Sequence, residues 1–294
     1  MEEKEKQIKT IAGEGCPIYY PENEQKTLRE IERSITKKYK KEIWSKFIKG
    51  IKDFNLIEEG DRIAVAISGG KDSLLMAKLF QELKKHPHMH FDIELITMDP
   101  GYHPDIKALH EENCGILGLD VHTYESKIFN VVGEIASQMP CYMCAKMRRG
   151  FLYARAQELG CNKLALGHHF DDVIETNLLN VLYAGSFKTM MPKIKATNFE
   201  NMELIRPLMY IREKDIIRWA SHCGIMPLNC ACMVSAKKTS NKRYEIKALI
   251  EELKKTNPNV ENNIFNSGMN VELGAIMCYK KNGIKYEFND LYGK

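Results

Sequence analysis

The sequence predicts an α/β fold: a parallel sheet with helices on both faces and helical additions at the N- and C-terminal ends. Two observations predict it. Short apolar runs alternate with helical patterns between residues 63 and 182, and this alternation is typical of βαβ units. A glycine turn directly follows two of the apolar runs, at Gly69 and at Gly167. Ligands of parallel sheets bind at such strand ends, so we expect a site there.

Composition sets mild limits on the class of protein. The 294 residues hold 43 lysines and arginines against 39 aspartates and glutamates, a net charge of +4, which permits an RNA partner without indicating one. The first residues lack the apolar core of a signal peptide, and no apolar stretch approaches a membrane span. We therefore expect a cytoplasmic protein with no membrane partner. Nine cysteines, an odd number, fit metal binding or catalysis better than a disulfide framework.

Three segments are expected along the chain. Residues 1–53 form an N-terminal extension with amphipathic helices, residues 54–236 the central domain, and residues 237–294 a C-terminal helical segment and tail. The extension is polar and irregular to about residue 25. Apolar residues then recur at helical spacing to residue 54, which predicts one or two amphipathic helices.

The central domain alternates strands and helices. Its predicted strands cover residues 63–67, 91–98, 121–124 and 163–166. Its predicted helices cover residues 72–83, 104–117, 143–159, 171–182 and 212–222. Apolar runs mark the strands and helical spacing marks the helices. Asp99-Pro100-Gly101 ends the second strand, Gly160 ends the third helix, and Gly167 stops the fourth strand.

The remainder is a loop followed by helices. Residues 224–236 form a loop with two cysteines, and closing helices are predicted over 241–255 and 260–269. Residues 283–294 show no strong pattern.

The first turn has the composition of a phosphate-binding loop. It reads Ser68-Gly69-Gly70-Lys71-Asp72-Ser73 and follows five apolar residues. Backbone N–H groups at such a turn, together with the positive end of the next helix, bind phosphate. It is not a Walker A loop, because that loop needs four residues between its glycines. The more compact turn suits pyrophosphate as a leaving group; the alternative is an ordinary strand-to-helix turn.

A second group of candidate residues is formed by cysteines. Cys141 and Cys144 open a helix at C-x-x-C spacing, and Cys230 and Cys232 lie in the downstream loop. Such thiolates can ligate one metal centre. We favour an iron–sulfur cluster held by Cys141, Cys144 and one downstream cysteine. A structural zinc, a thioredoxin-like redox pair and simple core packing are the alternatives.

Three protein ligands would leave one iron of a four-iron cluster open to an exogenous hydrosulfide, as catalytic zinc keeps a position for water. The five other cysteines stand alone, and packing is the role that we expect for them: Cys16, Cys114, Cys161, Cys223 and Cys278.

A third group follows the fourth strand. Gly167-His168-His169-Phe170-Asp171-Asp172 begins a helix, where acidic residues are often only caps. Beside a phosphate loop, however, such a carboxylate can hold Mg²⁺ or position a nucleotide.

These motifs together resemble the PP-loop tRNA 2-thiocytidine synthetases, the TtcA family. The likeness covers about residues 40–270. In chain order, its motifs are Ser68–Ser73, Cys141-x-x-Cys144 with Arg148-Arg149-Gly150, Gly167–Asp172, Arg206-Pro207-Leu208 and Arg212-Glu213-Lys214-Asp215. This chain reads Asn229-Cys230-Ala231-Cys232-Met233 where the family usually has a second Cys-x-x-Cys.

The resemblance implies an adenine-nucleotide α-hydrolase-like fold, with residues 54–236 as a PP-loop ATPase and thiolase domain. It implies ATP-dependent conversion of an anticodon-loop cytidine, position 32 of tRNA, to 2-thiocytidine. A [4Fe-4S] cluster would sit on Cys141, Cys144 and either Cys230 or Cys232. Within the same fold, the alternatives are thiolation of another tRNA position or of a small molecule. A cluster-bearing nucleotide sensor without catalysis is an alternative of a different class.

The chemistry assigns roles to the candidate residues. Because oxide is a poor leaving group, transfer of AMP to the C2 oxygen must come first, with pyrophosphate stabilised by Gly69, Gly70, Lys71, Ser68 and Ser73. Mg²⁺ would neutralise the remaining charge. The candidates for placing the metal, ribose or adenosine are Asp72, Asp172, Asp171, Asp99, Gly167 and His168.

The expected partners are tRNA and a cysteine desulfurase or other sulfide source, and a homodimer is compatible with the sequence. RNA contacts are expected from Lys146, Arg148, Arg149, Lys188, Lys193, Lys237, Lys238, Lys242 and Arg243.

Overall fold

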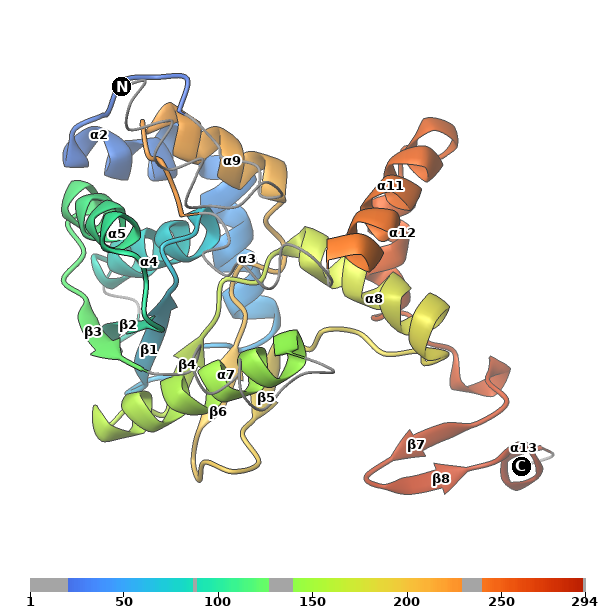
Figure 1. Ribbon diagram of the computed structural model, residues 1–294. Coiled ribbons are helices and arrows are strands. Elements are labelled where there is room, and N and C mark those ends of the chain that lie inside the picture. The colour runs from blue at the N-terminus through green and yellow to red at the C-terminus, as the bar shows by residue number, and fades with distance from the viewer. Residues whose placement is uncertain (1–20, 87–88, 127–139, 229–239, 293–294) are drawn as a thin grey trace.

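A six-stranded sheet forms the centre of the computed structural model, which describes residues 21–86, 89–126, 140–228 and 240–292 (Figure 1). Its strands, in spatial order, are β3 (His122–Glu125), β2 (Asp92–Asp99), β1 (Arg62–Ile67), β4 (Lys163–Ala165), β6 (Glu203–Ile205) and β5 (Lys193–Lys195). Neighbouring strands pair in parallel, except that β5 runs antiparallel to β6. The predicted α/β fold is confirmed. The sheet is mixed at one edge, however, where β5 and β6 were not predicted.

Helices cover both faces of this sheet. Helices α4 (Lys71–Lys84) and α7 (Pro140–Glu158) contact its strands. Helices α5 (Pro104–Leu117) and α9 (Glu213–His222) pack on α4, and α8 (Phe170–Ala184) follows β4 and leads away from the sheet. Side chains alternate along β1: Ile63, Val65 and Ile67 pack in the core that contains α4, whereas Ala64 and Ala66 pack with Tyr153 and Ala156 of α7. The two sides of the sheet therefore present different helices to any site at its edge.

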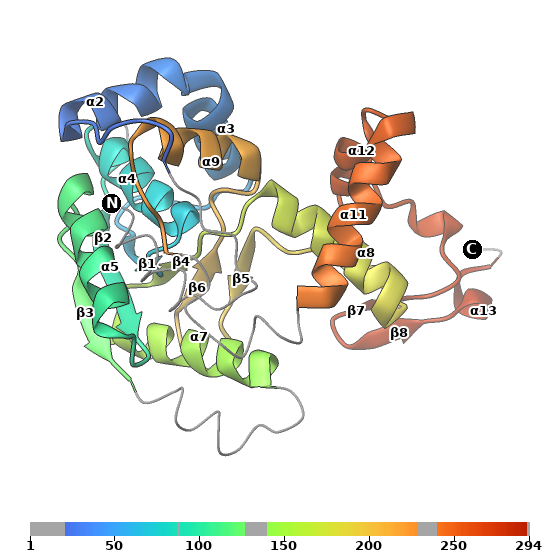
Figure 2. The same ribbon diagram turned by 45° about the horizontal axis from the view of Figure 1, so that its top comes forward.

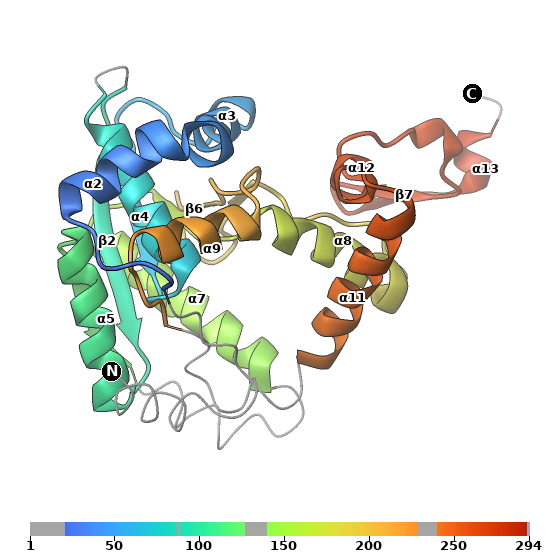
Figure 3. The same ribbon diagram turned by 90° about the horizontal axis from the view of Figure 1, so that it is seen from above.

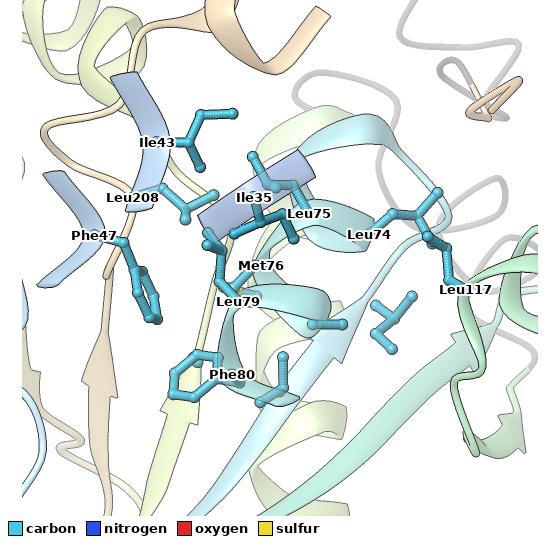
Figure 4. Packing of buried hydrophobic residues seen from close by; sticks show 14 of the residues in the cluster. Ile35, Ile43, Phe47, Leu74, Leu75, Met76, Leu79, Phe80, Leu117 and Leu208 are labelled. Atoms are coloured by element: carbon cyan, nitrogen blue, oxygen red, sulfur yellow. The ribbon is translucent and has the colours of Figure 1, made fainter. Parts of the chain in front are cut away.

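The N-terminal helices belong to the same core as α4. They are α2 (Leu28–Arg33), two π-helical turns (Ser34–Lys38 and Lys40–Trp44) and α3 (Ser45–Asp53). A capping box between Thr27 and Glu30 begins α2. Figure 4 shows Ile35, Ile43 and Phe47 directed toward Leu75, Leu79 and Phe80 of α4. The amphipathic pattern of residues 25–54 is thus explained by burial against the sheet domain.

A second, smaller core lies away from the sheet. Helices α11 (Ser240–Thr256) and α12 (Val260–Ser267) pack on α8 (Figures 2 and 3). Phe170 and Phe265 stack there with ring centroids 4.7 Å apart, beside buried Ile246 and Ile250. Helix α8 therefore joins the sheet domain to the C-terminal helices.

The tail contains structure that its sequence did not predict. After a 3-10 turn (Leu273–Ala275), β7 (Tyr279–Lys281) and β8 (Ile284–Tyr286) form a hairpin, and α13 (Phe288–Leu291) follows. Asn282 and Gly283 have positive φ values of 52° and 80°, the conformation that a two-residue hairpin turn requires. Residues 283–294 show no strong pattern in the sequence, yet they contain β8 and α13, because the Asn282-Gly283 turn lets β8 pair with β7.

The predicted helices and strands of the central domain are present, with ends shifted by up to three residues. The predicted closing helices correspond to α11 and α12. None of the helices in the described ranges has the length and apolar character needed to cross a membrane.

A buried ion pair ties β4 to the entry of β1. Lys163 Nζ lies 2.6 Å from Asp61 Oδ2, and both side chains are under 5% exposed. Asp61 also accepts hydrogen bonds from the Glu58 N–H at 2.6 Å and from Asn162 Nδ2 at 2.7 Å. The remaining carboxylates near Lys163, those of Glu58 and Glu203, are 3.9 Å away.

Asp61→Ala should lower the free energy of unfolding by about 3 kcal/mol, because it leaves a buried ammonium without its closest partner. Urea denaturation measures this. The control is Asp92→Ala, which breaks the exposed 3.0 Å pair with Lys84 and should cost less than about 1 kcal/mol. Equal losses in the free energy of unfolding would show that the buried pair contributes no more to stability than the exposed pair.

Candidate functional site

The turn after β1 has the geometry of an anion-binding loop. Gly69 has a φ of +77°, and a Cβ at this position would lie 2.5 Å from Leu228 Cδ1, so only glycine fits. Gly70 is the N-cap of α4, and no side chain caps the N–H groups of that helix start. The Ser73 hydroxyl braces the turn, accepting from the Ser68 N–H at 3.1 Å and donating to the Gly70 carbonyl at 2.9 Å. The helix N–H groups are thus left available to an anion.

The second glycine turn lies against the first. A Cβ on Gly167 would be 3.2 Å from the Ser73 nitrogen and 3.3 Å from the Asp72 carbonyl carbon, so a side chain there would separate the two turns. His169 and Asp172 cap α8 reciprocally: the His169 N–H donates to Asp172 Oδ2 at 3.0 Å, and the Asp172 N–H donates to His169 Nδ1 at 3.4 Å. The two predicted loops therefore meet at one sheet edge.

A pocket of about 410 Å³ opens where these turns meet. The ends of β1, β2 and β4 and the starts of α4 and α8 form one side of its lining, including Ser68, Asp72, Ser73, Met98, Gly167, His168 and Asp172. Arg148, Arg149 and Leu152 of α7 form another part. Its size is that of a small-ligand site. It joins residues from both faces of the sheet.

An ion-pair network holds Lys71 beside the turn. Lys71 Nζ lies 3.2 Å from Asp72 Oδ2 and 3.0 Å from Glu213 Oε1 of α9. Glu213 also pairs with Lys247 of α11 at 3.0 Å. Burial by itself would lower the pKa of Lys71, but the carboxylates of Asp72 and Glu213 overcome it and raise that pKa. Burial would likewise raise the pKa of Glu213, yet Lys71 and Lys247 bring it down to about 2.

The network continues to α8. Arg243 Nη1 lies 3.2 Å from both Asp172 Oδ1 and Glu175 Oε2, and Lys247 lies 3.6 Å from Glu175 Oε1. The C-terminal helices are thus electrostatically tied to the pocket. Sequence reasoning gave no role to Glu213, Lys247 or Glu175; Glu213 stood in a recognised motif, but its contact with Lys71 depends on the fold.

Some buried polar atoms of the site have no hydrogen-bond partner among the described residues. They are Asp72 Oδ1, His168 Nδ1 and, directly after β6, Arg206 Nε. His169 Nε2 lies 3.7 Å from Asp72 Oδ1, beyond hydrogen-bond distance. Burial lowers the pKa of His168 to about 4, although Asp172 opposes this, so its imidazole is neutral at pH 7. Asp72 and Asp172 offer carboxylates to a cation. No group of three or more His, Cys, Asp or Glu side chains placed to hold a metal ion occurs in the described part of the chain.

Other predicted residues have local roles. Asp99 Oδ1 accepts the N–H groups of Gly101 and Tyr102 at 2.9 and 2.8 Å, and so shapes the turn after β2. Asp171 Oδ2 accepts the Glu213 N–H at 2.7 Å and so fixes the start of α9. Lys193 pairs with Glu58 at 3.2 Å and Glu203 at 3.4 Å. Lys146, Lys188 and Lys242 carry no ion pair to another described residue.

The structure describes only some of the nine cysteines. Cys141 and Cys144 lie at the beginning of α7, and Cys16, Cys230 and Cys232, like Lys237 and Lys238, lie outside the described residues. Cys114, Cys161 and Cys223 are buried free thiols, as expected for packing. Cys278 is exposed next to the hairpin, so the expectation of packing is wrong for it.

Comparison with known proteins places this geometry in context. Residues 31–226 match the family described as the PP-loop domain. The tRNA-cytidine(32) 2-sulfurtransferase of Geobacter metallireducens is 38% identical over 231 residues, covering 76% of this chain and 87% of that protein. The enzyme of the same name from Geotalea uraniireducens is 39% identical over 229 residues, covering 76% and 89%.

A solved structure has the same fold. The U34-tRNA thiolase NcsA from Methanococcus maripaludis, solved with its [4Fe-4S] cluster, superposes with a TM-score of 0.60 at 24% identity, covering 80% of this chain and 81% of that chain.

Glu213→Gln should lower the free energy of unfolding by about 2 kcal/mol at pH 7. The pKa of Glu213 falls from its ordinary 4.5 to about 2 on folding. Its contribution is therefore complete above about pH 4.5 and is lost as the pH falls toward 2. Chemical denaturation of both proteins between pH 7 and pH 3 measures this, with Glu252→Gln, in an exposed pair with Lys255, as the control. If the difference in free energy of unfolding between the wild type and Glu213→Gln did not shrink at pH 3, that result would contradict a charged Glu213 carboxylate.

Proposed function

The chain belongs to the PP-loop family and, within it, to the tRNA-cytidine(32) 2-sulfurtransferases, and on this premise we propose that it replaces the C2 oxygen of cytidine 32 in tRNA with sulfur at the expense of ATP. One observation carries the proposal. A turn built for phosphate and the middle of the cysteine-bearing helix α7, through Arg148, Arg149 and Leu152, line one pocket. The identity of 38% to proteins named for this reaction supports the substrate.

The first step activates the oxygen. The C2 oxygen attacks the α-phosphorus of ATP, the bond from that phosphorus to the bridging oxygen breaks, and pyrophosphate leaves with the electron pair. The N–H groups at Gly69, Gly70 and the start of α4 receive the pyrophosphate, and Lys71 supplies a full positive charge. Because Asp72 and Glu213 hold Lys71 at 3.2 and 3.0 Å, its ammonium is oriented before the nucleotide arrives.

Asp72 and Asp172 are the residues that would hold Mg²⁺. Magnesium is commonly bound by one or two carboxylates together with substrate phosphates, and both side chains line the pocket. The Asp72 Oδ1 atom, buried and without a hydrogen-bond partner among the described residues, suits this role. We assign Gly167 and His168 to the same nucleotide site, and Asp99 and Asp171 to its supporting loops.

The second step exchanges oxygen for sulfur. Sulfide attacks C2, the C2–O bond breaks, and AMP leaves with the former carbonyl oxygen, so that no oxide ion is released. We propose a cysteine desulfurase or another sulfide source as the donor.

Cys141, Cys144 and either Cys230 or Cys232 are the residues that would hold a [4Fe-4S] cluster. Cys144 lies four residues before Arg148, a rise of about 6 Å along α7, and Arg148 lines the pocket. The Leu228 N–H donates to the Gly69 carbonyl at 2.9 Å, and Cys230 follows two residues later, within about 7 Å of chain. When bound, such a cluster supplies an open iron site that can carry sulfide.

The tRNA would be positioned by cations around the pocket. We assign Arg148 and Arg149 to it first, because they line the pocket; Lys146, Lys188, Lys193, Lys242 and Arg243 are the further candidates. The target base must leave its stack to enter. Phosphate contacts of this kind weaken as salt rises.

The test is anaerobic incubation of the reconstituted protein with ATP, sulfide and an unmodified tRNA, followed by nucleoside mass spectrometry. We expect 2-thiocytidine at position 32, with AMP and pyrophosphate formed in equal amounts. A thiolated nucleoside at another position, or none at all, would contradict the proposed substrate.

Lys71→Ala should abolish AMP release while the anaerobic absorption spectrum of the cluster is retained, because it removes the charge that faces the pyrophosphate. Cys141→Ala should do the reverse and lose the cluster spectrum. The matched controls are Lys84→Ala, at the far end of α4, and Cys278→Ala, in an exposed position. Full thiolation by Cys141→Ala would exclude the proposed sulfur route.

A further inference from the structure

A buried arginine close to the pocket has no acidic partner among the described residues. Ile205, which precedes it, accepts the N–H of pocket-lining Leu166 at 3.0 Å. Arg206 directly follows β6 and is 6% exposed. Its Nη1 donates to the Met191 carbonyl, and its backbone N–H donates to the Pro192 carbonyl at 2.9 Å. Its Nε has no partner, and it forms no ion pair within the described residues. A buried charge without a counter-charge is costly, so an anion from outside the chain is the expected partner.

Arg206 lies on the α7 side of the sheet. Residues alternate along β6, so Arg206 shares a face with Leu204, and Leu204 packs with Tyr153 of α7. Burial, together with the positive charge of nearby Arg149, lowers the pKa of Arg206 to about 10. Two guanidinium groups, from α7 and β6, are thus close enough to repel each other.

The carboxylate of Asp172 does not neutralise the charges of Arg149 and Arg206. Asp172 is the carboxylate that acts on Arg206, but it is already 3.2 Å from Arg243 and accepts the His169 N–H at 3.0 Å. Neither Arg148 nor Arg149 forms an ion pair within the described ranges; Arg148 contacts only the Tyr102 hydroxyl, at 3.5 Å. The α7 side of the pocket therefore carries uncompensated positive charge.

A neutral donor completes the group. His168 lines the same pocket, and its Nδ1 is buried without a partner among the described residues. Since its imidazole is neutral at pH 7, it can donate a hydrogen bond without adding to the repulsion between Arg149 and Arg206.

We propose that Arg149, Arg206 and His168 form a second phosphate site, on the α7 side of the pocket, which binds a phosphodiester of the RNA next to the nucleotide being modified. This inference rests on the proposed function. The RNA is favoured over the nucleotide as the source, because the Gly69–Gly70 turn and Lys71 already accommodate the phosphates of ATP on the α4 side. A flipped base brings its own backbone phosphate to the pocket, where paired guanidinium groups bind it well.

The experiment measures binding without turnover. An anticodon stem-loop RNA and an α,β-methylene analogue of ATP are titrated separately against the wild type, Arg149→Gln and Arg206→Lys. We expect each substitution to weaken RNA binding about tenfold, with the affinity for the ATP analogue unchanged. Arg149→Gln should also lower the salt slope of RNA binding by about one, whereas Arg206→Lys keeps its charge and should leave that slope nearly unchanged. Lys84→Gln, which removes one charge at the opposite end of the sheet, should bind both ligands as the wild type does.

A neutral methylphosphonate beside the target cytidine identifies the phosphate. It should weaken wild-type binding about tenfold but have little further effect on the arginine variants, since the contact is already lost. Thermal unfolding checks that Arg206→Lys is folded. If it is not, Arg149→Gln, at an exposed position, still tests the proposal.

The outcomes separate the two proposals. Wild-type protein that binds no tRNA contradicts the proposed function itself. The second phosphate site alone is overturned if both arginine variants bind RNA as the wild type does. It is also overturned if the methylphosphonate weakens RNA binding by the arginine variants as much as it weakens binding by the wild type. Weakened binding of the ATP analogue with unchanged RNA binding assigns the phosphate to the nucleotide and also overturns it.

Discussion

The close approach of Gly167 to the Asp72–Ser73 backbone is the constraint on which the site depends. Strands β1 and β4 are neighbours in parallel, so their loops emerge at one edge. A Cβ on Gly167 would lie 3.2 Å from the Ser73 nitrogen, so the loops approach this closely because residue 167 has no side chain. The starts of α4 and α8 then converge on one pocket. The start of α4 brings uncapped N–H groups and the start of α8 brings the Asp172 carboxylate, so the pocket gains the polarity that a nucleotide needs.

Charge is distributed unequally around this pocket. On the side of α4, α9 and α11, carboxylates hold Lys71, Arg243 and Lys247; Lys71, for example, is paired with Asp72 and Glu213. Those contacts orient a group that must act on a leaving pyrophosphate. On the α7 side, Arg149 and Arg206 lack such partners in the described part of the chain. One side is therefore organised before binding, and the other is completed by a ligand that brings its own negative charge.

Local sequence was enough to predict much of this. The apolar runs before Gly69 and Gly167 and the helices after them depend on neighbouring residues, and they were placed within a few positions. Strands β5 and β6 have only three residues each, too few for a periodic pattern, so their pairing partners define them. Glu213, Lys247 and Arg206 act through contacts between distant segments, which spacing along the chain does not encode. The cysteine ligands remain a prediction from motif and chain reach.

The route of one oxygen atom tests the central claim most directly. If the base is adenylated, the C2 oxygen of the target cytidine becomes an oxygen of AMP. A tRNA carrying ¹⁸O at that position, thiolated in a single turnover, should yield AMP that contains the label, measured by mass spectrometry. Label found in water or inorganic phosphate, with unlabelled AMP, would contradict adenylation of the base and with it the assignment of this pocket.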